Sequence, residues 1–131
     1  MRILIYGING NLGRYLRKFL REKFTICAYE NLDEILYRLP DTNKITKSIL
    51  KFKPDIVVNL IAYADVDGCE DNIKKAYLSN VSTISSIVES INSNSIKFKP
   101  HLIHISTDHL YDGIGYKNEN EIKLLNISAF N

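Results

Sequence analysis

Short apolar runs alternate along this chain with longer stretches in which apolar residues recur every three or four positions. The apolar runs cover residues 2–6, 24–29, 55–61 and 101–106. The first and third are almost continuously apolar, a pattern typical of strands that helices bury on both faces. The four runs therefore predict the strands of a parallel sheet.

Three stretches between the runs have the spacing of one apolar helix face, over residues 11–22, 42–52 and 73–91. The polar residues 92–95 end the third stretch. Residues 62–69 mix small, acidic and glycine residues, so we expect a loop there. Strand and helix thus alternate, which predicts an α/β fold with a Rossmann-like, doubly wound parallel sheet.

Composition narrows the class of protein. The 131 residues, 45% of them hydrophobic, match a single domain. Because 17 Lys and Arg residues nearly balance 15 Asp and Glu residues, the net charge of +2 gives no reason to expect a nucleic-acid partner. No apolar run approaches the roughly 20 residues that cross a bilayer, and the apolar run before Gly7 is too short for a secretory signal. We therefore expect a cytoplasmic protein with no membrane contact.

The cysteines offer no metal chemistry. Cys27 and Cys69 have no further Cys or His near them at the spacing of metal ligands. Free thiols are the expected state, and no metal site is expected.

Three glycines at three-residue intervals, Gly7, Gly10 and Gly13, join the first run to the first amphipathic stretch. In a dinucleotide-binding turn the first glycine allows a sharp exit from the strand, the second lets a diphosphate approach the backbone, and the third lets the helix pack closely. The helix N-terminus adds unpaired N–H donors and a partial positive charge. We interpret this segment as a cofactor site that also includes Asn9, Asn11 and Leu12. A purely structural turn is the alternative.

Two acidic residues extend the predicted nucleotide site. Glu30 follows the second run 17 residues after Gly13, where a carboxylate meets the adenosine ribose and favours NAD over NADP. A solvated glutamate at a strand end is equally compatible. Asp41 either caps the next helix or accepts a hydrogen bond from the adenine amino group, and the two roles are compatible with each other.

Three further segments resemble the extended short-chain dehydrogenase/reductase family, and within it the dTDP-4-dehydrorhamnose reductases. They are residues 54–59 (PDIVVN), 66–70 (VDGCE) and 106–113 (STDHLYDG). The family shows a PD-apolar-apolar-VN strand, a VDxxE loop and an STDYVFDG segment in this order. The likeness covers nearly the whole chain, which would be less than half of a complete family member.

The resemblance implies roles for further residues. The glycines would hold the diphosphate of NAD or NADP, Asp41 the adenine, and Ala62, Tyr63 and Ala64 the ribose on the nicotinamide side. Asn80 would support the active site from behind, and Thr107 would bind the keto oxygen of the sugar, with Asp108 beside it. The family strand order 3-2-1-4 would pair the fourth strand with the first and leave an open edge. A second copy or a partner chain could then pair with that edge.

One departure from the family pattern concerns catalysis. The family reduces a ketone with a tyrosine proton donor and a lysine four residues later. Here Ser128 stands at the tyrosine position, and the sequence ends before the lysine. We therefore expect a truncated reductase domain, without the later strands and the sugar-binding part, that is inactive alone.

Three functions remain open from the sequence. The first is the NAD(P)-binding part of a nucleotide-sugar reductase, for which a nucleotide sugar is a partner only in the complete protein. The second is a non-catalytic nucleotide-binding or regulatory module derived from that family. The third is a structural partner that docks through its open edge without nucleotide, and the intact glycine turn of residues 7–13 argues against it.

Overall fold

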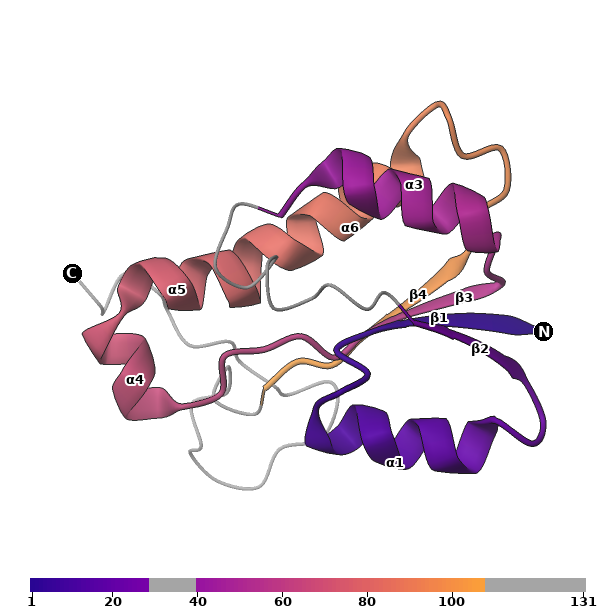
Figure 1. Ribbon diagram of the computed structural model, residues 1–131. Helices are drawn as coiled ribbons and strands as arrows, with labels where there is room; N and C mark the ends of the chain where they lie inside the picture. Colours follow the sequence, from indigo (N-terminus) through magenta and orange to yellow (C-terminus); the bar gives the residue numbers. More distant parts are fainter. Residues whose placement is uncertain (29–39, 108–131) are drawn as a thin grey trace, which may run out of the picture.

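The computed structural model describes residues 1–28 and 40–107 (Figure 1). The described residues contain one sheet of four parallel strands in the order β2-β1-β3-β4. The strands are β1 (Arg2–Tyr6), β2 (Thr25–Ala28), β3 (Ile56–Asn59) and β4 (His101–His104). The predicted Rossmann-like parallel sheet is confirmed. The predicted order 3-2-1-4 is wrong for these strands, because the third strand along the chain pairs with the first and the fourth, not with the second.

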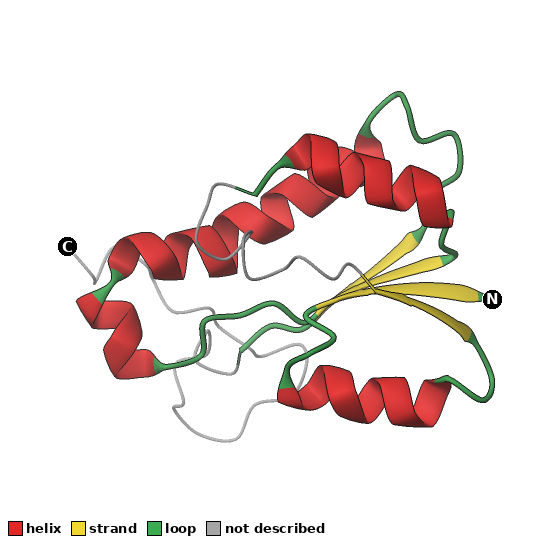
Figure 2. Cartoon of the chain, in the orientation of Figure 1, coloured by secondary structure: helices red, strands yellow, loops and turns green. Residues whose placement is uncertain are grey.

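The handedness of the crossovers explains which face of the sheet each helix covers. Helix α1 (Asn11–Leu20) covers one face of the sheet, whereas α3 (Thr42–Phe52) and α6 (Thr83–Asn92) cover the other (Figure 2). Parallel crossovers are right-handed, so helices change face when the chain reverses its direction across the sheet. The chain moves outward from β1 to β2 and then returns past β1 to β3. The reversal places a topological switch point between β1 and β3, where ligands bind in open α/β sheets.

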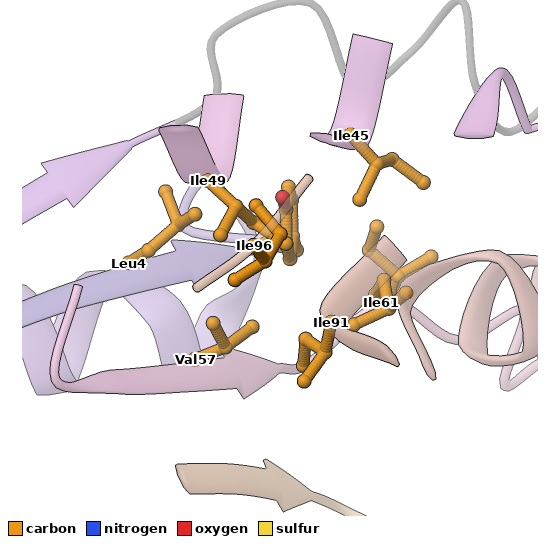
Figure 3. Packing of buried hydrophobic residues seen from close by; sticks show 9 residues of the cluster. Leu4, Ile45, Ile49, Val57, Ile61, Ile91 and Ile96 are labelled. Atoms are coloured by element: carbon orange, nitrogen blue, oxygen red, sulfur yellow. The ribbon is translucent and has the colours of Figure 1, made fainter. Parts of the chain in front are cut away.

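Two apolar layers hold the helices to the sheet. On the α1 face, Ile3, Ile5 and Val58 pack with Leu16 and Leu20. On the opposite face the strands meet α3 and α6 in a larger cluster that Figure 3 shows. Its labelled members are Leu4, Ile45, Ile49, Val57, Ile61, Ile91 and Ile96. On α3 the predicted apolar face is buried through Ile45 and Ile49. On α1 only Leu16 and Leu20 of the predicted face pack on the sheet, and Leu12, Tyr15 and Phe19 are exposed.

The prediction of a loop over residues 62–69 is wrong from residue 66 onward, where α4 (Val66–Asp71) begins. The Asp65 side chain caps this helix by accepting a hydrogen bond from the Gly68 N–H at 3.2 Å. A Cβ at Gly68 would meet the Tyr63 hydroxyl and the Asp65 carboxylate, so a larger residue there would require these side-chain ends to move. The low helix propensity of glycine explains why the sequence suggests a loop.

The third amphipathic stretch is helical, as predicted, and contains an irregular turn. It consists of α5 (Ile73–Tyr77), a π-helical turn η1 (Leu78–Ser82) and α6. The fourth strand ends at His104, two residues earlier than expected, although the Ile105 N–H still donates to the Asn59 carbonyl at 3.3 Å.

Within the described ranges no helix is long and apolar enough to span a membrane, and no group of three or more His, Cys, Asp or Glu residues could hold a metal ion. Cys27 and Cys69 are free thiols. Burial raises the pKa of the Cys27 thiol, while the charge of Arg2 lowers it by less. In the part of the chain that the structure describes, β4 pairs with β3 alone.

Candidate functional site

Three segments leave the sheet at the carboxyl ends of its strands (Figure 1). Tyr6, Asn59 and His104 are register partners at the carboxyl ends of β1, β3 and β4. The glycine turn, the segment after β3 and the segment leading to Thr107 therefore start side by side. In a doubly wound sheet, ligands bind at these carboxyl ends of the strands.

The first glycine makes the sharp exit from β1. Gly7 has a φ of +83°, in the left-handed region that favours glycine. A Cβ there would lie 2.9 Å from the carbonyl carbon of Leu60, so the turn and the end of β3 are in close backbone contact. The Gly10 N–H closes the turn by donating to the Gly7 carbonyl at 3.1 Å.

The other two glycines have different surroundings. Gly13 is buried, and a Cβ there would overlap the carbonyl oxygens of Gly7 and Ile8. Gly10 is exposed, and a Cβ there would meet only the Gly7 oxygen, at 3.3 Å. Gly13 is therefore required for packing α1 on the turn, whereas Gly10 keeps an open surface free of side-chain atoms.

The N-terminus of α1 is open toward a ligand. Gly10 is its N-cap residue, so no side chain caps the helix, and its first turn contains no acidic residue. The free N–H groups there give a partial positive charge. The neighbouring residues assigned to this site, Asn9, Asn11 and Leu12, are exposed. Arg14, which the sequence analysis missed, donates from Nε to the Asn9 carbonyl at 2.9 Å and ties the turn to the helix. Its only sequence signal is a cation directly after the third glycine.

Asn59 shapes the exit from β3. It is 1% exposed, and its Oδ1 accepts the Ile61 N–H at 3.2 Å. Because a backbone N–H can only donate, the amide nitrogen of Asn59 faces His104 and donates to Nδ1 at 3.1 Å. The sequence analysis did not assign these residues, although one amide inside an apolar run is a signal for such a role.

Asn80 lies against the segment that follows β3. Its Oδ1 accepts the Tyr63 N–H at 2.7 Å, and its Nδ2 donates to the Tyr63 carbonyl at 3.1 Å. The Cys69 thiol donates to the same carbonyl at 3.3 Å, and the Lys75 ammonium lies 3.8 Å from the centre of the Tyr63 ring. The Tyr63 peptide is therefore fixed between two exposed residues, Ala62 and Ala64.

Of the remaining predicted site residues, the structure describes Asp41 and Thr107. Asp41 caps α3, because its Oδ1 accepts the Asn43 and Lys44 N–H groups at 2.9 and 3.2 Å. The capping interpretation is confirmed, and a contact with adenine stays a prediction. Thr107 is exposed, three residues beyond the end of β4. Outside the described residues are Glu30, Asp108 and Ser128.

The chain is similar to sugar-biosynthesis reductases over most of its length. It is 35% identical over 114 residues to the dTDP-4-dehydrorhamnose reductase of Aggregatibacter actinomycetemcomitans, covering 86% of this chain and 36% of that protein. It is 33% identical over 116 residues to the spore coat polysaccharide biosynthesis protein SpsK of Bacillus subtilis (strain 168), covering 87% of this chain and 38% of that protein. The chain thus spans little more than a third of the length of these curated relatives.

Solved structures agree with this relationship. A hypothetical dTDP-4-dehydrorhamnose reductase from Sulfolobus tokodaii is 34% identical with a TM-score of 0.75, over 96% of this chain and 47% of that one. The dTDP-4-dehydrorhamnose reductase of Bacillus anthracis str. Ames, solved in complex with NADP, is 25% identical with a TM-score of 0.73, over 87% of this chain and 39% of that one. The family model of the RmlD substrate binding domain matches residues 1–127. This match covers nearly the whole sequence, and the chain belongs to the RmlD substrate binding domain family.

Proposed function

We propose that this chain binds NAD or NADP at the turn of Gly7, Gly10 and Gly13, as the cofactor-binding part of a nucleotide-sugar reductase. The exposed Gly10 at the uncapped N-terminus of α1 is the main observation in favour. It lies at the switch point between β1 and β3, where dinucleotides bind in this fold. Support also comes from the Bacillus anthracis relative, whose structure contains NADP.

The turn fits a diphosphate in shape and charge. Its surface at Gly10 has no Cβ, so backbone N–H groups can approach phosphate oxygens closely. The helix end adds a partial positive charge, and no carboxylate in the first turn opposes it. Arg14 adds a guanidinium that is already oriented by the Asn9 carbonyl. These groups would hold the diphosphate without any change in the turn.

The segment after β3 is the proposed support for the nicotinamide half. Ala62 and Ala64 offer an exposed surface of small side chains, and Asn80 fixes the peptide between them. Thr107 follows β4 at the carboxyl ends of the strands, and the resemblance implies that it would bind the keto oxygen of the sugar. A dinucleotide bound across the carboxyl ends of the strands would thus reach from α1 toward the proposed sugar position.

The choice between the two dinucleotides rests on opposing indications. Glu30 at the adenosine ribose would favour the free 2′-hydroxyl of NAD. Arg14 near the turn and the NADP-bound relative favour NADP. Both cofactors therefore belong in the binding experiment.

For catalysis we propose that this sequence does not complete the family reaction. Bound reduced nicotinamide would supply a hydride, but by the family resemblance Ser128 would stand at the position of the tyrosine proton donor. An aliphatic hydroxyl is a poor general acid near neutrality. This substitution also favours the second candidate function, a nucleotide-binding module without turnover.

Calorimetric titration with NAD and NADP tests the proposed binding. We expect at least one of them to bind the wild-type chain. Gly10→Val adds a branched side chain at backbone angles that valine tolerates, so it should fold and weaken binding by about tenfold or more through contact with the diphosphate. Ser85→Val, on the exposed face of α6, is the control and should bind as wild type. Absence of binding to the wild-type chain, or equal affinity of the Gly10→Val variant, would contradict the proposal.

A further inference from the structure

The helix that contains Asn80 is interrupted where Asn80 lies. The chain is helical from α5 through α6, and the turn η1 between them has π-helical hydrogen bonding. Single π turns inside α-helices are rare and are often found at functional sites. A specific interaction must therefore hold this turn in place.

The π turn changes the face on which Asn80 lies. Residues seven apart share one face of a regular α-helix, so an uninterrupted helix would direct Asn80 to the same side as Ile87, which is 0% exposed. A π turn accommodates one additional residue per turn. Leu78 and Ser79 are accordingly buried, while Asn80 is exposed and reaches the Tyr63 peptide.

Thr83 supplies two donors to this turn. Its backbone N–H and its hydroxyl both donate to the Leu78 carbonyl, the hydroxyl at 2.9 Å. Thr83 is 1% exposed, so this hydroxyl has no solvent partner to exchange with. A hydroxyl bonded five residues back fits the π spacing, whereas threonine in a regular helix bonds three or four residues back.

We propose that Thr83 is a positioning residue for the cofactor site: its hydroxyl holds the π turn that directs Asn80 to the backbone of Tyr63. The proposal rests on the proposed function, because it gives the Tyr63 segment its role beneath the nicotinamide half. Thr83 acts only through Asn80 and touches neither cofactor nor substrate.

The test compares Thr83→Val, which keeps the shape and removes the hydroxyl, with Thr83→Ser, which keeps the hydroxyl. Two properties are measured: hydrogen exchange of the Tyr63 N–H by NMR, and affinity for the dinucleotide and for ADP. ADP contains the diphosphate but lacks the nicotinamide-side ribose. For the valine variant we expect exchange faster by about two- to tenfold and dinucleotide affinity lower by the same factor, the range for one hydrogen bond. ADP affinity should not change, and serine should restore both properties.

A second comparison separates positioning from general destabilisation. In an Asn80→Ala background, Thr83→Val should cause no further loss of dinucleotide affinity, because the residue through which it acts is gone. Thr83→Cys replaces the valine variant if the latter does not fold. Unchanged exchange and affinity in the hydroxyl-free variant, equal losses for ADP and dinucleotide, or additive losses with Asn80→Ala would overturn the proposal. If the wild-type chain binds no dinucleotide, the proposed function fails, and Tyr63 exchange alone decides the role of Thr83.

Discussion

At the scale of single residues, the glycines of one motif have separate roles. Gly7 provides a left-handed backbone angle, Gly13 provides space for packing, and Gly10 provides an open surface. Only the last property concerns a ligand directly. Stability and binding should therefore respond differently to substitution along the same turn.

Alanine substitutions test this separation. Gly13→Ala places a methyl group against the Gly7 and Ile8 carbonyls and should lower the free energy of unfolding by about 2 kcal/mol or more. Gly10→Ala has an allowed backbone and should cost less than about 1 kcal/mol. Urea unfolding with matched m-values measures both. Equal losses for the two variants would refute the packing role of Gly13.

Sequence reasoning identified residues with local chemistry better than residues with long-range partners. The glycine roles follow from spacing between a strand and a helix, and Asp41 follows from capping preference. The contact of Asn59 with His104 depends on which strands are neighbours, so the sequence could not reveal it. Arg14 was missed for a different reason: its partner is only five residues away, but a backbone carbonyl gives no signal in the sequence.

At the scale of elements, α3 depends on its N-terminal cap. Asp41 accepts from two N–H groups, and α3 contributes Ile45 and Ile49 to the larger apolar cluster. Any role of Asp41 at adenine would be additional to this. Variants that keep the cap can separate the two roles.

Asp41→Ala should lower the free energy of unfolding by about 1 kcal/mol, because it leaves helix N–H groups without an acceptor. Asp41→Asn keeps a good capping residue and should stay within about 0.5 kcal/mol of wild type. Asp71→Ala, at an exposed residue at the end of α4, is the control. An Asp41→Ala variant that unfolds at the wild-type urea midpoint would show that the cap does not contribute to the free energy of unfolding.

The irregular elements were the least predictable. A glycine inside α4 reduces the local helix signal, and its close neighbours are the side-chain ends of Tyr63 and Asp65. The π turn of η1 lies within a continuous helical pattern, which does not distinguish a π turn from an α turn. Both irregularities lie next to the Tyr63 segment, where the proposed site is.

At the scale of the whole molecule, the fold class was predictable from alternating strands and helices, but the strand order was not. Order depends on the direction in which each crossover returns, which periodicity does not encode. The family match over residues 1–127 and the reductase structures establish the ancestry. What the chain does by itself is a separate question, because it spans little more than a third of its curated relatives.

A turnover assay addresses that question. The purified chain, mixed with NADH or NADPH and a dTDP-4-keto sugar, should show no loss of reduced-nicotinamide absorbance, because the resemblance implies that Ser128 stands where the family has its proton donor. A full-length reductase of the family provides the positive control. Steady oxidation of either cofactor by this chain would show that another group donates the proton.

The central claim is that the glycine turn is the diphosphate site, and amide chemical-shift mapping of the labelled chain with NAD and NADP tests it most directly. We predict that the largest shifts occur at the N–H groups of Gly10, Asn11 and Leu12, with a second group around Ala62 to Ala64. Saturable binding whose shifts leave the turn unchanged, or no shift at any concentration of either dinucleotide, would contradict the account.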